Sequence, residues 1–211
     1  MIEKIVFNLL GFAIFIIVFG RFIKKNDTSY VYVLGLEFLG IVINFIELIF
    51  NIHLNLFFRI LIYILSIIIP AVILIIEYKK KIDFSEMLNI TLAKIALNSG
   101  NTEKAKGYLF KLIKKYPESY IGHKTLAEVY EKEENYSVAV DEYIRANGIN
   151  NKDIKLNYKI ADLLNKDKRA NEAINVLQDI LNRNPDYYKA TDLLGEILYT
   201  NERYKEAINV Y

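Results

Sequence analysis

Small residues recur at a fixed interval in the second half of this 211-residue chain. Four alanines are each 34 positions apart: Ala105, Ala139, Ala173 and Ala207. An aliphatic residue lies 13 positions before each of them, at Leu92, Leu126, Ile160 and Leu194, and a second small residue follows it, at Ala93, Ala127, Ala161 and Gly195. A period of this length indicates a unit of supersecondary structure whose copies stack side by side.

Equivalent positions near the end of each repeat unit also carry recurring residues. Two of the three complete units end in proline, at Pro117 and Pro185, and Asn151 occupies the equivalent place in the middle unit. The pattern resembles the tetratricopeptide repeat family, whose unit is a pair of antiparallel helices with small residues where they pack closely. The resemblance covers about 60% of the chain, residues 82–211.

The resemblance implies an all-α fold in which an α-solenoid of helix-turn-helix repeats forms the second domain. The implied units are 86–119, 120–153, 154–187 and 188–211, the last of them incomplete. Tyr130 stands at the family's aromatic position of helix A, and Tyr143 and Tyr211 stand at that of helix B. The positions where the family often has tryptophan differ here: Asn89, His123, Asn157 and Thr191. Because the fourth unit ends midway through its second helix, we expect further residues or another chain to complete the stack.

The first 81 residues have a different character, with three long apolar segments at about 5–22, 30–50 and 54–77. A helix needs about 20 mostly apolar residues to cross the hydrocarbon core, so these segments predict a three-helix transmembrane anchor. A cleaved signal peptide is the alternative for the first segment. The start MIEK, which has no net side-chain charge, and the lack of a small-x-small site after the apolar run favour an anchor. Pro70 predicts a kink in the third span, because its missing N–H leaves the Ser66 carbonyl without its helical partner.

Positive charges predict the orientation of the anchor. Six lysines and arginines follow spans one and three, at Arg21, Lys24, Lys25, Lys79, Lys80 and Lys81, whereas only Lys4 and Arg59 flank the other side. Because basic flanks resist translocation, the prediction is a multi-pass protein of the cytoplasmic membrane with its N-terminus outside and the repeats in the cytoplasm. The three lysines at 79–81 can contact anionic lipid headgroups, and a capping-box spacing at Asp83 and Glu86 predicts that the first repeat helix begins directly after them.

Polar residues within the spans give two interpretations. Glu37, Asn44 and Glu47 share one stripe of the second span with Gly40, and Arg59 lies at the depth where Glu47 can pair with it. The stripe is either a proton, cation or ligand site, or a set of interhelical hydrogen bonds with close packing at Gly40. The second interpretation is the more common one for such residues.

The family binds extended peptides or helices in an inner groove lined by helix A residues. Carried over onto this sequence, the groove positions are Ile90, Lys94, Leu97, Lys124, Glu128, Glu131, Tyr158, Asp162, Asn165, Asp192, Glu196 and Tyr199. The set is mixed in charge and carries aromatic and aliphatic residues. It differs from the Lys/Asn/Arg set with which chaperone-binding members hold a terminal carboxylate, since Ile90 and Lys94 stand at two of those positions.

Few residues point to chemistry, and we expect no enzyme activity, catalytic residues, metal or cofactor. The sequence has no phosphate-binding glycine loop, no G-x-S-x-G and no H-E-x-x-H, and it has no cysteine. Its two histidines, His53 and His123, fall in different domains, and we expect His123 to be a core residue. The net charge is +3 over residues 1–81 and −1 over residues 82–211, which gives no positive footprint for nucleic acid.

These observations favour a membrane-anchored scaffold that recruits a protein or peptide through its cytoplasmic groove. A membrane sensor or transporter component is the alternative; its polar stripe in the second span would bind a ligand and its repeats would serve as relay or assembly module. A third possibility is an enzyme with a catalytic domain beyond Tyr211. The abundance of Ile, Asn and Lys is typical of an AT-rich bacterial genome.

Overall fold

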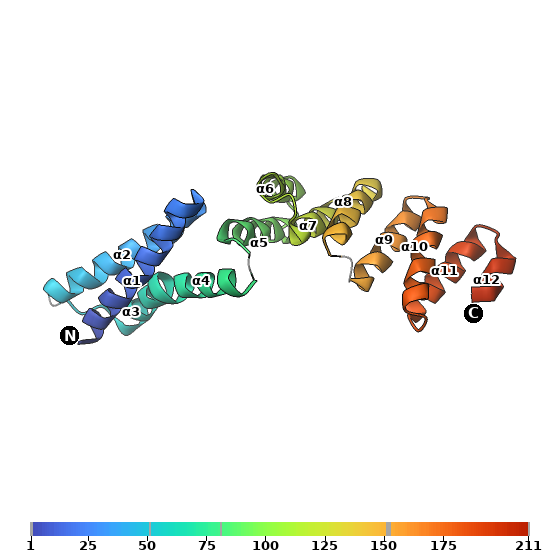
Figure 1. Ribbon diagram of the computed structural model, residues 1–211. Coiled ribbons are helices and arrows are strands. Elements are labelled where there is room, and N and C mark those ends of the chain that lie inside the picture. The colour runs from blue at the N-terminus through green and yellow to red at the C-terminus, as the bar shows by residue number, and fades with distance from the viewer. Residues whose placement is uncertain (1, 51, 81, 151–152, 211) are drawn as a thin grey trace. The chain divides into compact units, whose positions relative to one another are not determined.

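The computed structural model describes residues 2–50, 52–80, 82–150 and 153–210. Helices make up the whole secondary structure of these residues, which confirms the all-α prediction (Figure 1). The chain forms two compact units, 1–88 and 89–211, and the division falls within α5 (Phe84–Asn98).

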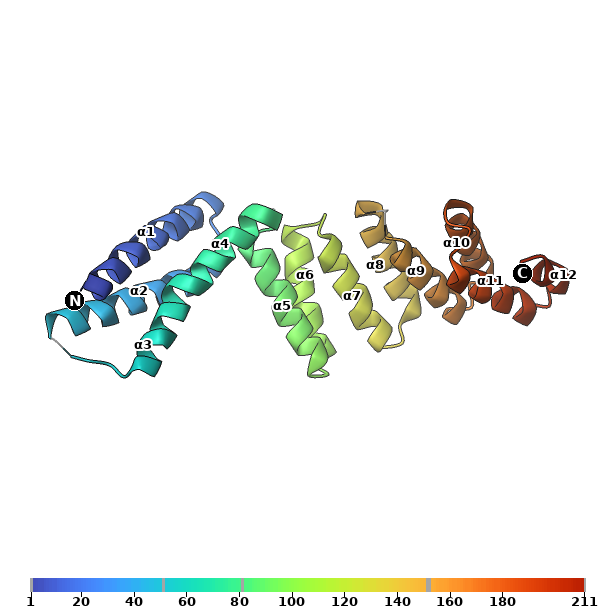
Figure 2. The same cartoon turned by 90° about the horizontal axis from the view of Figure 1, so that it is seen from below.

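The first unit consists of three long helical segments. Helix α1 (Ile2–Lys25) packs against α2 (Ser29–Ile49), and the third segment runs through α3 (Leu56–Tyr63), a π-helical turn η1 (Ile64–Ile68) and α4 (Ile69–Lys80) (Figure 2). The three predicted spans fall on these three segments. By length and composition, each segment is long and apolar enough to cross a membrane.

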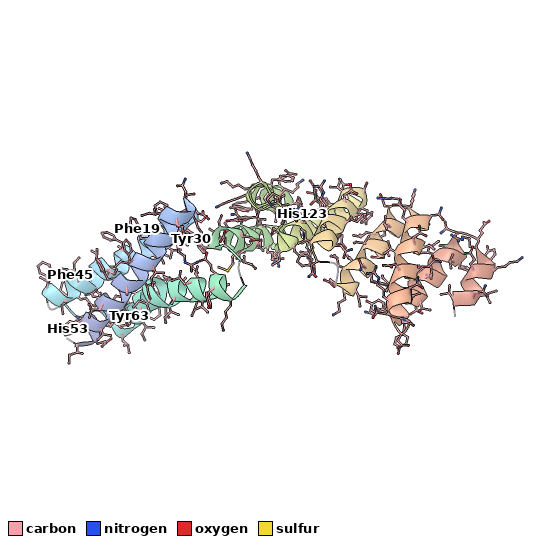
Figure 3. The ribbon with its side chains drawn as sticks, viewed as in Figure 1. Phe19, Tyr30, Phe45, His53, Tyr63 and His123 are labelled. Atoms are coloured by element: carbon pink, nitrogen blue, oxygen red, sulfur yellow. The ribbon has the colours of Figure 1, made fainter. Side chains whose placement is uncertain are left out.

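Side chains in this unit are distributed in the opposite way to those of a water-soluble bundle. Large apolar residues point outward: Phe19 and Phe45, labelled in Figure 3, are 45% and 53% exposed. The polar residues Glu37, Asn44 and Glu47 are instead buried between the helices. Such an arrangement is favourable when the surroundings are apolar, because burying apolar groups brings no gain there and exposing polar groups to lipid is costly.

The interruption predicted at Pro70 takes the form of the π-helical turn just before it. The N–H of Ile69 donates to the carbonyl oxygen of Ile64, five residues earlier, and the hydroxyl of Ser66 donates to the carbonyl oxygen of Ile62 at 2.6 Å. The hydrogen-bond register therefore shifts one turn upstream of the proline.

Gly40 allows α2 to approach this irregular turn closely. A Cβ atom added at Gly40 would lie 2.5 Å from Cβ and 2.6 Å from Oγ of Ser66, whereas one added at Gly35 would meet nothing within 4 Å. The contact agrees with the close packing that the polar stripe of α2 predicts at Gly40.

After α4, the described residues form eight further helices, arranged as four consecutive pairs. Helix A of each pair is α5, α7 (Tyr120–Lys132), α9 (Ile154–Lys166) or α11 (Tyr188–Thr200), and helix B is α6 (Thr102–Lys115), α8 (Tyr136–Ile149), α10 (Ala170–Arg183) or α12 (Tyr204–Val210). Helix α5 begins directly after Asp83, as predicted. The repeated alanines Ala105, Ala139 and Ala173 are 0% exposed, and Ala207 is 7% exposed. Their small side chains allow the helices of the solenoid to pack closely.

The turns of the solenoid repeat with the same period as its core. Each turn from helix A to helix B has one residue in the left-handed region, at Gly100, Glu134, Lys168 and Glu202. The side chains of Asn101 and Asn135 cap α6 and α8, accepting from the N–H groups of Lys104 and Val138. In the third and fourth repeats an arginine, Arg169 or Arg203, stands at the equivalent position. It forms a bidentate ion pair with the glutamate three residues later in the sequence.

His123 is a core residue, as the sequence predicts. The side chain is buried on α7 (Figure 3), where one ring nitrogen lies 2.6 Å from Oε2 of Glu142 on α8 and the other lies 2.8 Å from the carbonyl oxygen of Pro117. Both ring nitrogens are thus hydrogen-bonded within the repeat, which explains how a histidine can occupy a packing position. Asn151 and Tyr211, two of the residues that mark the repeat, lie outside the described residues.

We predict that Gly40→Ala destabilises the first unit by about 1–3 kcal/mol, because the added methyl group overlaps Ser66. The measurement is thermal unfolding of the full-length protein in detergent. Gly35→Ala is the matched control and should be neutral or slightly stabilising, since its methyl group meets open space. Combining Gly40→Ala with Ser66→Gly should restore most of the lost stability. Equal losses for both alanine variants would contradict the contact.

Candidate binding groove

The predicted groove positions lie along the A helices, and eleven of the twelve have at least partly exposed side chains. The exception is Ile90, which is only 8% exposed. Ile90 therefore does not offer an open binding surface. The predicted groove begins instead at Lys94, one turn further along α5, which is exposed.

A pocket of about 330 Å³ lies in the middle of the groove. It is lined by three predicted residues, Lys124, Glu128 and Glu131, and by four that the sequence reasoning did not include: Tyr143, Lys155, Leu156 and Lys159. The additional residues come from α8 and from the start of α9. Their contribution depends on how repeat three packs on repeat two, which single-repeat positions do not reveal.

Most charges around this pocket are neutralised within the chain. Lys159 Nζ lies 2.5 Å from Oε1 of Glu131, and the Tyr143 hydroxyl donates to the other oxygen of that carboxylate at 3.2 Å. Lys124 Nζ lies 3.6 Å from Oδ2 of Asp153. These pairs hold α7, α8 and α9 together beneath the groove.

Glu128 differs from its neighbours, because it makes no ion pair or hydrogen bond within the described part of the chain. Burial raises the pKa of its carboxyl above the ordinary value, although the positive charges of Lys94 and Lys124 act in the opposite direction. A half-buried carboxylate without a partner is a group that a ligand can satisfy. Lys155, at the rim of the same pocket, is exposed and also has no ion-pair partner among the described residues.

The groove continues over repeats three and four with residues of α9 and α11. Tyr158 packs edge-on against Tyr187, with 5.9 Å between ring centroids. Asp162 pairs with Lys166 at 2.9 Å, and Asn165 is partly exposed on the same helix. On α11, Asp192, Glu196 and Tyr199 are exposed. Leu97, at the end of α5, is partly buried against the core of the first repeat.

The predicted intramembrane residues lie inside the first unit. Asn44 donates to the carbonyl oxygen of Lys4 at 2.9 Å, and Glu47 lies 3.7 Å from Arg59, the pair that the sequence allows. Lys4 also lies 3.7 Å from Glu47, a contact that the sequence analysis did not include. Glu37 is fully buried, and neither of its carboxylate oxygens has a hydrogen-bond partner in the described residues.

A second polar cluster in this unit was missed altogether. Glu77 is only 5% exposed and accepts hydrogen bonds from the Tyr30 hydroxyl, from Arg21 at 2.8 Å and from the Phe84 N–H at 2.7 Å. Lys25 bridges Glu77, at 3.5 Å, and Asp83. The cluster joins the ends of α1, α2 and α4 to the start of α5. Arg21 and Lys25, taken as free flanking charges, are therefore partly neutralised inside the protein.

The remaining predicted contacts involve the basic run at 79–81. Lys79 is exposed, nothing is described of the side chain of Lys80, and Lys81 lies outside the described residues. Over the described part of the chain, no three histidine, aspartate or glutamate side chains come together in a way that would hold a metal ion.

The repeats are similar to those of one protein family and of several solved structures. A family model described as the tetratricopeptide repeat protein 21 C-terminal ARM domain matches residues 75–189. Among solved structures, MamA of AMB-1 is 18% identical with a TM-score of 0.53, over 58% of this chain and 67% of that one. YrrB, described as a TPR protein with an unusual peptide-binding site, is 21% identical with a TM-score of 0.51, over 64% of this chain and 68% of that one. No curated protein matches the sequence.

Asp153 provides a test of how the groove is held together. Its carboxylate accepts from the Leu156 N–H at 3.1 Å, which caps α9, and from the Tyr120 hydroxyl at 2.9 Å. Burial opposes ionisation, but these hydrogen bonds and the charge of Lys124 outweigh it and hold the pKa of Asp153 below its ordinary value of 3.8. A carboxyl with a lowered folded-state pKa stabilises the fold above its unfolded pKa and loses this contribution as the pH falls through the folded value.

We therefore predict that Asp153→Ala lowers the free energy of unfolding by about 1–2 kcal/mol near neutral pH. The difference from wild type should shrink once the pH falls below the ordinary aspartate pKa. Pulse proteolysis of the full-length protein in urea, at neutral and acid pH, measures both effects. Asp141→Ala, at an exposed position of α8, is the control and should change little. A cost for Asp153→Ala that does not depend on pH would contradict the role assigned to the carboxylate.

Proposed function

The chain belongs to the family of the tetratricopeptide repeat protein 21 C-terminal ARM domain, and from that premise we propose that it is a membrane-anchored scaffold for protein–protein interaction. In this proposal, three N-terminal helices hold the protein in the cytoplasmic membrane with its N-terminus outside. The repeats lie in the cytoplasm and recruit a peptide or protein through their groove. The protein is proposed to act by binding and not by catalysis.

The anchor is supported by the inverted distribution of side chains in the first unit. Its long helices expose phenylalanine and isoleucine along their length and bury Glu37, Asn44 and Glu47 between them. Exposing so much apolar surface to water would be unfavourable, at roughly 25 cal/mol per Å². Lipid contact would remove this cost, and the exposed Lys79 at the end of α4 is proposed to contact headgroup phosphates.

Recruitment through the groove is supported by the groups that the chain leaves unsatisfied there, and Glu128 is the observation that carries the proposal. Around it, Lys159 and Glu131 satisfy each other, as do Lys124 and Asp153, but the Glu128 carboxylate has no partner within the described residues. Partly buried charges are normally paired, since desolvation is costly otherwise. A bound peptide would supply the missing partner.

The test is a crosslinking pull-down from membranes with a groove variant chosen from the structure. Lys94→Glu with Glu196→Lys reverses two exposed charges without ion-pair partners in the described chain, at opposite ends of the groove. Lys124 is less suitable, because it pairs with the residue that caps α9. We predict that wild type captures a specific protein and that the variant loses most of it, by about tenfold or more, through the reversed charges.

The matched control is Lys111→Glu with Asp141→Lys, which makes the same two charge changes on helices α6 and α8. It should capture the partner as wild type does. Equal capture by the groove variant and the control variant would show that the groove is not the working surface.

The buried carboxylate of Glu37 favours a second candidate, in which the membrane unit senses or transports a ligand and the repeats relay or assemble. A fully buried acid without hydrogen-bond partners in the described residues is costly to keep, and residues of this kind in membrane helices often carry function. The same pull-down separates the candidates if Glu37→Gln is added. The scaffold proposal expects unchanged capture with at most reduced stability, whereas the sensor proposal expects capture to change in a folded protein.

A further inference from the structure

The groove over repeats three and four carries acidic and aromatic side chains together. Its residues are Tyr158 and Asp162 on α9 and Asp192, Glu196 and Tyr199 on α11, and we refer to these five as the acidic–aromatic surface. On each helix the members are spaced three or four apart, so they share one face. The predicted groove is therefore chemically different here from its first half.

The carboxylates of this surface are only partly neutralised. Asp162 pairs with Lys166 at 2.9 Å, but Asp192 and Glu196 have no ion pair among the described residues, although Lys189 lies one turn before Asp192. Burial is the main reason that the pKa of Tyr158 lies above its ordinary value, and the charges of Asp162, Glu196 and Asp192 raise it further. Carboxylates of both α9 and α11 thus act electrostatically on Tyr158.

The aromatic rings leave surface open for contact. Tyr199 is 66% exposed and packs edge-on against Tyr204, with 5.4 Å between ring centroids. Together with Glu196 these two rings line a pocket of about 560 Å³ between α11 and α12. A carboxylate beside a tyrosine face is a favourable environment for a guanidinium or ammonium group, through ion pairing and cation–π contact combined.

The first half of the groove has the opposite balance. Lys94 of α5, Lys124 of α7, and Lys155 and Lys159 of α9 lie around its central pocket or before it, against Glu128, Glu131 and Asp153. The central pocket therefore has a slight excess of positive charge, whereas the exposed carboxylates of Asp192 and Glu196 make repeat four the part of the groove that attracts cations. Anionic lipid headgroups would be repelled by the acidic–aromatic surface, and no group of three potential ligands in the described chain favours a metal ion.

We propose that the acidic–aromatic surface binds an arginine- or lysine-bearing segment of the partner protein. This inference rests on the proposed scaffold function and assigns the chemistry of the partner at one end of the groove. Asp192 and Glu196 form ion pairs with the basic side chains, and Tyr158 and Tyr199 cover their apolar stems and cationic heads. Charge complementarity also sets the polarity of the bound segment, with its basic end toward repeat four.

The test uses the full-length protein in detergent and a fluorescent synthetic peptide in which arginine and leucine alternate. Fluorescence anisotropy measures how tightly the peptide binds. Asp192→Asn with Glu196→Gln removes the charges while preserving the size of the side chains. We expect this variant to bind the peptide about tenfold more weakly than wild type, and added salt to reduce the difference. Glu118→Gln with Asp141→Asn lowers the negative charge equally outside the groove and should bind as wild type does.

A peptide in which glutamate replaces arginine should not bind. The proposal is overturned if the two neutralised variants bind the arginine peptide equally, or if the glutamate peptide binds as well as the arginine peptide. Applying Asp192→Asn with Glu196→Gln in the membrane pull-down distinguishes this failure from failure of the scaffold function. If capture is lost with the charge-reversed variant, Lys94→Glu with Glu196→Lys, but kept with the neutral variant, the scaffold function stands. The proposal that the partner segment is basic is then refuted.

Discussion

Close approach of helices at one small side chain per repeat is the constraint on which the solenoid depends. Ala105, Ala139, Ala173 and Ala207 stand 34 positions apart and are all buried. A larger residue at these positions would separate the helices and turn the A helices away from one another. The predicted groove depends on successive A helices following one another in the same phase of the 34-residue period. The side chains at its positions vary from repeat to repeat, whereas the period does not.

Much of this architecture is predictable because it follows from periodicity and hydropathy. The repeat placed the helix pairs, and the apolar runs placed the three long helices of the first unit. Features that depend on packing between distant residues were not predictable. Ile90 is buried where a groove residue was expected, and the Glu77 cluster draws its members from four helices. Arg169 and Arg203 stand at helix starts where propensity rules favour short polar caps, and each forms an ion pair with the glutamate three residues later that those rules do not anticipate.

Buried polar groups link the structure to the two candidate functions. Within the repeats, Glu131 pairs with Lys159 and Lys124 pairs with Asp153 across neighbouring helices, whereas Glu128, Asp192 and Glu196 have no ion pair among the described residues. Within the first unit, Glu37 stands out in the same way. Desolvation makes the half-buried Glu128 and the buried Glu37 costly, and this cost is recovered when a partner or proton arrives, whereas Asp192 and Glu196 are exposed to solvent. The unsatisfied groups therefore indicate where binding can be coupled to the state of the protein.

The central claim is that the first unit spans the cytoplasmic membrane with the groove inside the cell, and cysteine labelling tests it most directly. The chain has no cysteine of its own, so single cysteines at Ile52, Thr28 and Lys111 report cleanly; all three are exposed. A membrane-impermeant maleimide should label Ile52→Cys in intact cells, and Thr28→Cys and Lys111→Cys only after permeabilisation. Labelling of Thr28→Cys and Lys111→Cys in intact cells, with protection of Ile52→Cys, would contradict the account.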